Sequence, residues 1–296
     1  MKRHPARYYT RALLACLLAA AAWGAAAAPP PRARAADKLR PEEIVAKHLE
    51  AVGAAETRES VTSRMILGTV VATFRSPAAG QVGGRAVLAS KREMNVIGMA
   101  FPDNPNYPQE KVGYDGKDVS ASYVQPGLRS TLGEFLLSNK GVVKQGLLGG
   151  ALSASWPLFG PAERMGKLES GGTKTLNGRP AYEVKYFPRG GSDLRVSLFF
   201  DAETFQHVRT EYTRTTAAQM GPTPEASAQQ SEARYKMVEE FSDFRREGGL
   251  SLPHGYRLSL EIRSGARSFT AEWAVTLTQF AFNQKIAPEV FDVDDK

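Results

Sequence analysis

Three histidines lie beyond residue 35, and histidine is the side chain best suited to bind a metal or to transfer protons near neutral pH. His48, His207 and His254 belong to three separate stretches, with no His-x-His pair and no carboxylate at metal-ligand spacing. The sequence also has no Gly-x-Ser-x-Gly elbow, no phosphate-binding loop and no His-Glu-x-x-His motif. We therefore predict no catalytic residues, no bound metal and no cofactor, with His48 partly buried and the other two histidines exposed.

Two further groups of residues could bind ions, and both have a simpler interpretation. Asp292, Asp294 and Asp295 resemble a calcium-binding cluster in composition, but an acidic run near a chain end is usually solvated. Glycine pairs such as Gly83-Gly84 lack the strand-to-helix context of a phosphate cradle, so they are predicted to be turns. A hydrolase whose catalytic residues are not recognisable in the sequence stays open as an alternative.

The first 35 residues have the pattern of a secretory signal peptide. A basic start is followed by an apolar stretch and then by small residues. The apolar stretch is shorter than the roughly 20 residues that span a bilayer, and no later segment is long and apolar enough to do so. Ala33-Arg34-Ala35 predicts cleavage after Ala35, since a cut after Ala28 would leave Pro29 at the new N-terminus. We expect residues 36–296 to form a single exported domain.

The leader also accounts for the basic composition of the chain. Six of the 38 lysines and arginines lie in the first 35 residues, which contain no acidic residue, so the remaining 32 nearly balance 31 acidic residues. We therefore predict no nucleic-acid partner, because such proteins carry an excess of basic residues. The single cysteine, Cys16, lies too close to Arg11 for a lipoprotein signal, so we expect no lipid anchor and no disulfide in the exported chain.

Two stretches predict helices. Residues 41–52 begin with Pro41-Glu42-Glu43 and continue with apolar residues at helical spacing, which indicates an amphipathic helix that ends at Gly53. Residues 130–159 are rich in apolar side chains but are interrupted by five glycines, each of which costs about 1 kcal/mol relative to alanine within a helix. We predict two short helices and an apolar tail here, a segment that could cover the open side of a curved sheet.

The rest of the chain alternates apolar and polar residues with the period of β-strands. Turns at Asp115-Gly116, Asn177-Gly178 and Gly190-Gly191 separate consecutive strands, and a further turn is expected over residues 80–84. In the last strand the apolar face changes register, which predicts a bulge near residues 278–279. Residues 216–230 are polar and predict a loop. The fold class is therefore α+β, mainly antiparallel β, with one apolar sheet face.

Several of these stretches resemble the periplasmic lipoprotein-carrier family, that is, the LolA/LolB-type proteins and the outer-membrane lipoprotein-sorting proteins around them. The resemblance covers most of residues 36–296; beside the opening helix it is carried by Leu176-Asn177-Gly178-Arg179-Pro180-Ala181-Tyr182-Glu183-Val184 and Leu198-Phe199-Phe200-Asp201-Ala202-Glu203-Thr204. It implies a single curved sheet that forms an unclosed half-barrel, covered on its concave side by a few helices. It also implies a periplasmic protein, not an enzyme, whose concave side takes acyl chains of lipoproteins or other lipids without covalent chemistry.

The resemblance and the apolar face leave two functions to compare. The first is a periplasmic carrier or binding protein for a lipid or a lipoprotein acyl chain, since each CH₂ group removed from water contributes roughly 0.8 kcal/mol. The second is an envelope interaction or sensor module that binds a partner protein with the same scaffold. The apolar face could also be an ordinary core without a cavity.

The candidate site follows from the strand pattern. If residues 130–159 form a lid, Trp156→Ala should weaken binding of a fluorescent fatty acid; unchanged binding with loss of a partner would indicate an interface. The lid residues are Phe135, Leu136 and Trp156. The residues expected to line the cavity are Tyr182, Val184, Leu198, Phe200, Leu258, Leu260, Phe269 and Trp273.

Overall fold

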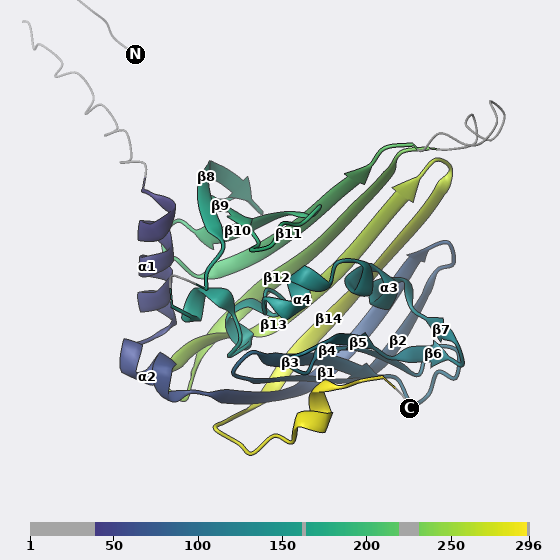
Figure 1. Cartoon of the computed structure of the whole chain (residues 1–296), viewed down its shortest axis with the longest axis horizontal. Helices are drawn as coiled ribbons and strands as arrows, with labels where there is room; N and C mark the ends of the chain where they lie inside the picture. Colours follow the sequence, from purple (N-terminus) through teal and green to yellow (C-terminus); the bar gives the residue numbers. More distant parts are fainter. Residues whose placement is uncertain (1–38, 162–163, 219–230, 295–296) are drawn as a thin grey trace, which may run out of the picture. The chain divides into compact units, whose positions relative to one another are not determined.

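The strands form one antiparallel sheet that bends around a concave side (Figure 1). The computed structural model describes residues 39–161, 164–218 and 231–294. Twelve strands follow the order β5-β4-β3-β2-β1-β14-β13-β12-β11-β10-β9-β8. The edges are β5 and β8, and within the described residues no ladder joins them, so the sheet stays an unclosed half-barrel. The predicted fold class is confirmed.

The strand bounds show long central strands and short strands at one edge. They are β1 (Ser63–Ser76), β2 (Gly80–Lys91), β3 (Met94–Ala100), β4 (Gln109–Tyr114), β5 (Val119–Ala121), β8 (Lys167–Leu176), β9 (Arg179–Phe187), β10 (Arg195–Asp201), β11 (His207–Thr216), β12 (Ala233–Glu247), β13 (Leu250–Ser264) and β14 (Arg267–Phe282). A separate hairpin pairs β6 (Tyr123–Gln125) with β7 (Leu128–Arg129).

Most of the predicted turns are confirmed. The Asp115, Asn177 and Gly190 turns connect β4 to β5, β8 to β9 and β9 to β10. The bulge in β14 is also present, because Leu67 pairs with Gln279 and Gly68 with Leu277. The extra residue, Thr278, moves the inward face from Leu277 to Phe280.

The turn expected over residues 80–84 is wrong. The chain reverses over residues 77–79, and Gly83 and Gly84 pair with Val71 and Val70 inside the β1–β2 ladder. Pro77 has no N–H to donate to a ladder and so ends β1. Gly84 is needed for a close approach rather than a turn, since an added Cβ would lie 2.2 Å from the Ala100 carbonyl oxygen. Residues 1–35 and most of the predicted 216–230 loop lie outside the described residues.

Helical segments cover the concave side and one end of the half-barrel (Figure 1). The predicted first helix is confirmed as α1 (Pro41–Val52) and is followed by α2 (Ala55–Ser60). The two short helices predicted in residues 130–159 are α3 (Thr131–Ser138) and α4 (Lys140–Lys144), with the 3₁₀ turns η1 (Gly150–Leu152) and η2 (Pro157–Phe159) after them. None of the helices among the described residues is long and apolar enough to cross a membrane.

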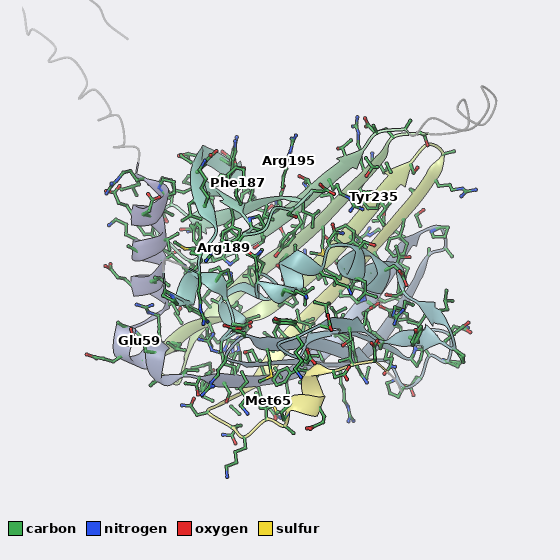
Figure 2. The ribbon with its side chains drawn as sticks, viewed as in Figure 1. Glu59, Met65, Phe187, Arg189, Arg195 and Tyr235 are labelled. Atoms are coloured by element: carbon green, nitrogen blue, oxygen red, sulfur yellow. The ribbon has the colours of Figure 1, made fainter. Side chains whose placement is uncertain are left out.

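A second, smaller apolar cluster lies on the outer face of the sheet. The C-terminal segment with η3 (Pro288–Phe291) places Ile286, Phe291 and Val293 against Ala89 and Val96. Met65 packs against this cluster and lies beside the C-terminal segment in Figure 2. The backbone N–H of Val293 donates to Ser120 Oγ at 2.9 Å. The sequence pattern did not predict this outer cover.

Candidate functional site

The residues predicted to contact a ligand lie in one apolar layer on the concave side. Tyr182 and Phe269 are half-buried there. The fully buried members are Val184, Leu198, Phe200, Leu258, Leu260 and Trp273 from the sheet, with Phe135, Leu136 and Trp156 from the segment above it. The structure thus brings all the predicted residues into one core cluster, while a bound ligand stays a prediction.

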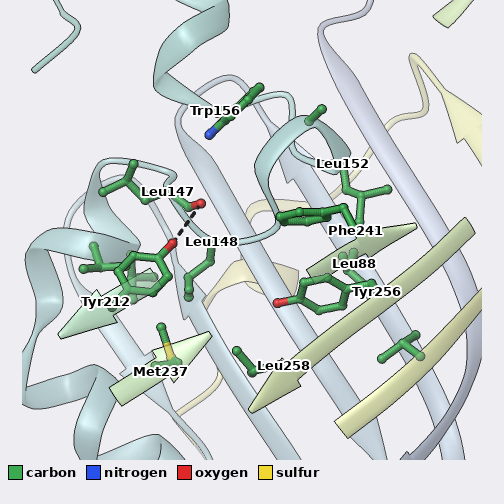
Figure 3. Close-up of a cluster of buried hydrophobic side chains, with 14 of the residues drawn as sticks. Leu88, Leu147, Leu148, Leu152, Trp156, Tyr212, Met237, Phe241, Tyr256 and Leu258 are labelled. Atoms are coloured by element: carbon green, nitrogen blue, oxygen red, sulfur yellow. Dashed lines mark hydrogen bonds between the residues drawn. The ribbon is translucent and has the colours of Figure 1, made fainter. Parts of the chain in front are cut away.

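Residues 130–159, called the lid segment below, fill the space over the sheet (Figure 3). Leu147, Leu148 and Leu152 pack in one cluster with sheet residues such as Met237 and Leu258. Two spaces between the lid segment and the sheet measure about 10 Å³ each, which is enough for about one water molecule. The concave side is therefore packed rather than hollow, because the lid segment occupies the volume that an acyl chain would need.

The first end of the lid segment, residues 130–138, is fixed to the sheet by a polar chain. Ser130 caps α3 by accepting the Gly133 N–H at 2.8 Å, and its hydroxyl donates to Glu110 Oε1 at 2.8 Å. Tyr107 donates to Glu110 Oε2 at 2.7 Å and accepts from Trp273 Nε1 at 2.9 Å. Burial raises the pKa of Glu110 to about 7 despite these hydrogen bonds. We call residues 130–138 the α3 end.

The middle of the lid segment is held by a second buried acid, Glu239. Its carboxylate accepts the Gly149 N–H, the Tyr212 hydroxyl and the Tyr256 hydroxyl, each at 2.7 Å. The Tyr212 hydroxyl also lies 3.3 Å from the Leu147 carbonyl oxygen (dashed in Figure 3). Burial raises the pKa of Glu239, and the three donors lower it. Glu239 thus ties the sheet floor to the lid backbone.

The other end of the lid segment, residues 149–159, packs on two histidines; we call it the η end. Trp156 stacks on His207 at a centroid distance of 4.9 Å and meets His48 edge-on at 5.1 Å. His207 Nε2 lies 2.9 Å from Thr210 Oγ1, and His48 Nδ1 lies 2.8 Å from the Phe205 carbonyl oxygen. Since a carbonyl can only accept, His48 Nδ1 carries the proton.

All three histidines are more buried than the sequence suggested, since His48 was expected to be partly buried and His207 and His254 to be exposed. His48 and His207 are each 1% exposed and His254 is 7% exposed. Burial lowers the pKa of His48 to about 4 and that of His207 well below its usual value, so both are neutral at pH 7. Their burial comes from α1 and the lid segment lying across distant strands, which strand periodicity does not reveal.

Within the described residues, three ring nitrogens at the η end lack a hydrogen-bond partner: His48 Nε2, His207 Nδ1 and Trp156 Nε1. Gly150 packs directly against His207, and an added Cβ there would lie 2.8 Å from Nδ1. A buried polar group without a partner costs about 1–3 kcal/mol. In the described part of the chain, the η end therefore carries an energetic cost from unpartnered polar atoms that the α3 end does not.

Arg64 on β1 is the remaining polar residue beneath the η end. It is 1% exposed, and its Nη1 donates to the Ala151 carbonyl oxygen. Its guanidinium lies 5.0 Å from the centroid of the Phe159 ring. Neither Arg64 nor Glu239 was predicted from the sequence. Their spacing was the available signal. Arg64 lies two residues before Ile66, and Glu239 lies two residues from both Met237 and Phe241, so each shares the inward face of its strand with these apolar residues.

Two larger grooves open on the surface. One, of about 710 Å³, has Trp156, Pro157 and Phe159 of the η end in its wall, with Arg92 and Arg164 nearby. The other, of about 750 Å³, crosses β8 to β14, and its lining includes paired charges such as Arg209 and Glu240. Only the first groove adjoins the lid segment.

Of the candidate metal ligands in the sequence, His48 and His207 lie together, with ring centroids 6.2 Å apart. Among the described residues there is no group of three or more His, Cys, Asp or Glu side chains that could hold a metal ion. Asp294 forms a salt bridge with Arg129 at 3.2 Å, and Asp295 lies outside the described residues.

Known proteins resemble this chain in fold, not in sequence. No family profile and no curated protein matches the sequence. A LolA superfamily protein from Nitrosomonas europaea aligns with a TM-score of 0.44 at 11% identity over 86% of this chain and 97% of its own. A DUF1329 family protein from Desulfovibrio piger gives 0.40 at 8%, over 85% and 96%. A domain classed with outer-membrane lipoprotein-sorting proteins, from Vibrio parahaemolyticus, gives 0.41 at 10%, over 83% and 97%. With TM-scores below 0.5, these similarities assign no function.

Proposed function

We propose that the protein binds the apolar chain of a lipid or of an acylated lipoprotein on the concave face of the half-barrel, after the lid segment has moved away. The observation that carries this proposal is that the lid segment, rather than the sheet itself, fills the concave side. Displacing it would uncover a mainly apolar face that includes Phe200, Leu258 and Trp273 and is interrupted by Glu239. A ligand chain would then replace the lid side chains in the same volume.

The construction of the lid segment favours such a movement. It contains two short helices and two 3₁₀ turns, so little of its stability comes from helix formation. Its five glycines add backbone freedom when it leaves the sheet. At the η end, three buried polar atoms without partners in the described structure reduce the cost of separation.

An acyl chain can offset the loss of lid packing. Burying about 14 CH₂ groups contributes roughly 11 kcal/mol at about 0.8 kcal/mol each. This gross contribution is comparable with the burial of residues 149–159 alone, whose buried apolar side chains include Ala151, Leu152, Trp156 and Leu158, at roughly 1.5–3 kcal/mol for each large side chain. The signal-peptide pattern of residues 1–35 supports export, and an exported bacterial protein meets such chains in envelope lipids and lipoproteins.

The tryptophans provide a direct test. The chain has three, and one of them, Trp23, is in the predicted leader. Trp156 and Trp273 are each 1% exposed and face the concave side, so a brominated fatty acid should quench them by contact and do so saturably. Acrylamide, which stays in water, should quench them little. Leu67→Gln on the outer face, 39% exposed, is the matched control and should leave the titration unchanged.

Two negative results together would refute the binding proposal. If the brominated fatty acid gives no saturable quenching, and mass spectrometry of the gently purified protein shows bare polypeptide, the binding proposal is wrong. The same scaffold would then be best explained as a module that binds a partner protein.

A further inference from the structure

Arg64 is a buried positive charge at the polar end of the apolar face. It lies at the start of β1 with 1% exposure, donates to the Ala151 carbonyl oxygen and packs over the Phe159 ring. Burial lowers its pKa to about 10, so the guanidinium stays charged at neutral pH. No salt bridge joins it to a carboxylate anywhere in the described ranges, and its Nε has no hydrogen-bond partner there.

A charge in this position is expensive for the folded protein. Buried charges are normally paired, and replacing a buried ionic group with apolar side chains is often neutral or stabilising. The neighbouring positions on the inward face, such as Ile66 and Val70, are apolar and fully buried. An arginine without a carboxylate partner among these residues indicates a role when the lid segment is displaced.

The neighbours of Arg64 make this end suitable for a headgroup. Phe159, which covers the guanidinium, contacts Trp156 at 5.3 Å, and Trp156 in turn packs on His207 and His48. Arg64 Nε and Trp156 Nε1 are donors without partners in the described structure. Both lie at this end of the face and both donate, so the oxygen atoms of one headgroup placed here could accept from Arg64 and from Trp156.

The surface groove gives access to this place. Trp156 and Phe159 form part of the wall of the groove of about 710 Å³, so their displacement would connect the groove with Arg64. The acids near the groove are already engaged: Glu93 pairs with Arg164, and Asp115 accepts the backbone N–H groups of Lys117 and Asp118 at 2.7 and 2.8 Å. They do not compensate Arg64.

We infer that the ligand is an amphiphile with an anionic headgroup, a carboxylate or a phosphate, and that Arg64 binds this headgroup when the η end moves away. This inference rests on the proposed function and adds the chemical class of the ligand. The acyl chain would run from Arg64 along the concave face. The planar guanidinium suits such a headgroup because it can donate two parallel hydrogen bonds.

The test compares two ligands that differ only in the headgroup charge: an ω-brominated fatty acid and its methyl ester, both read out by quenching of Trp156 and Trp273. Wild-type protein should bind the acid about 10- to 100-fold more tightly than the ester, as expected for a hydrogen bond to a charged group. Arg64→Met should remove this preference while keeping ester binding. Arg64→Lys should retain part of it. Inorganic phosphate alone should not displace the acid at millimolar concentration, whereas a long-chain alkyl phosphate should.

The outcomes separate the two proposals. If wild type binds acid and ester equally, the headgroup inference is wrong and chain binding stands. If inorganic phosphate alone displaces the acid fully, the site binds an anion without a chain, and the inference of an amphiphile is wrong. If neither ligand quenches, the proposed function itself fails. Urea unfolding supplies a second measurement. Arg64→Met should be as stable as wild type or more stable. A large loss of stability would show that the charge of Arg64 is compensated in the closed protein and would overturn the inference.

Discussion

The α3 end and the η end of the lid segment are bound to the same sheet by different chemistry. At the α3 end, Glu110 receives hydrogen bonds from both Tyr107 and Ser130, and Ser130 also caps the helix. At the η end, His48, His207 and Trp156 are stacked but each leaves one ring nitrogen without a partner within the described chain. The η end is the more deeply buried of the two, since none of residues 149–159 is exposed whereas Thr131, Glu134 and Ser138 of the α3 end are. The ends therefore differ in how their buried polar groups are paired, and the difference does not come from greater exposure of the η end.

The difference indicates which end moves. Breaking the α3 end would expose a complete hydrogen-bonded chain from Trp273 to α3, whereas opening the η end would hydrate groups that gain hydrogen bonds from water. We therefore expect the α3 end to act as the anchor and the η end to open. Glu239, which binds the Gly149 N–H, lies at the boundary between the two.

A change of pH should separate the two ends most strongly. Acidification should increase the contribution of Glu110 to the free energy of unfolding and decrease that of His48. Glu110 has a folded pKa of about 7, above its ordinary value of 4.5, so its stabilising contribution is present below pH 4.5 and is lost as the pH rises through 7. His48 has a folded pKa of about 4, below 6.5, so its contribution is present above pH 6.5 and is lost as the pH falls through 4.

Each contribution amounts to roughly 3 kcal/mol between pH 8 and pH 4. In urea unfolding, wild type should gain about that much relative to Glu110→Gln on acidification and lose about that much relative to His48→Asn. Parallel pH profiles of wild type and Glu110→Gln would show that Glu110 is not buried as described.

Hydrogen exchange should show a somewhat smaller difference between the ends. The amide of Ala154 at the η end and that of Gly133 at the α3 end both donate to side-chain oxygens. If the η end opens on its own, the Ala154 amide should exchange on the order of 100-fold faster than the Gly133 amide, corresponding to a difference of about 3 kcal/mol in opening free energy. Equal protection at both positions would mean that the lid segment opens as one unit.

A pair of serine substitutions should give the smallest effect. Ser130→Ala removes the α3 cap and one donor to Glu110, and should lower the free energy of unfolding by about 1–2 kcal/mol. Ser153→Ala at the η end loses a hydroxyl whose recorded contacts, with Ser155, stay within the lid segment, and should change it by less than about 0.5 kcal/mol. Thermal and urea melts of the two variants check this; a larger effect for Ser153→Ala would reverse the assignment of anchor and opening end.

The sequence was sufficient for the local features of this fold and insufficient for its long-range contacts. Asn177-Gly178 predicted the β8–β9 turn because its conformation depends on two residues, and the shift from Leu277 to Phe280 predicted the β14 bulge. The burial of His207 could not be predicted, since it arises from Gly150 and Trp156, more than 50 residues away in the chain. The filled interior could not be predicted either, because it depends on how closely the lid segment approaches the sheet.

A disulfide lock tests the central claim most directly, since Cys16 is the only native cysteine and can be replaced by Ser. Ser90→Cys with Ala154→Cys would close the η end, where Ser90 Oγ accepts the Ala154 N–H at 2.8 Å. Ala121→Cys with Gly133→Cys would lock the α3 end, where the two Cβ positions lie 3.5 Å apart, within disulfide range. The account predicts that the oxidised 90–154 lock abolishes quenching by the brominated fatty acid and that reduction restores it, while the 121–133 lock leaves quenching intact. Full quenching with the η end locked would contradict the account.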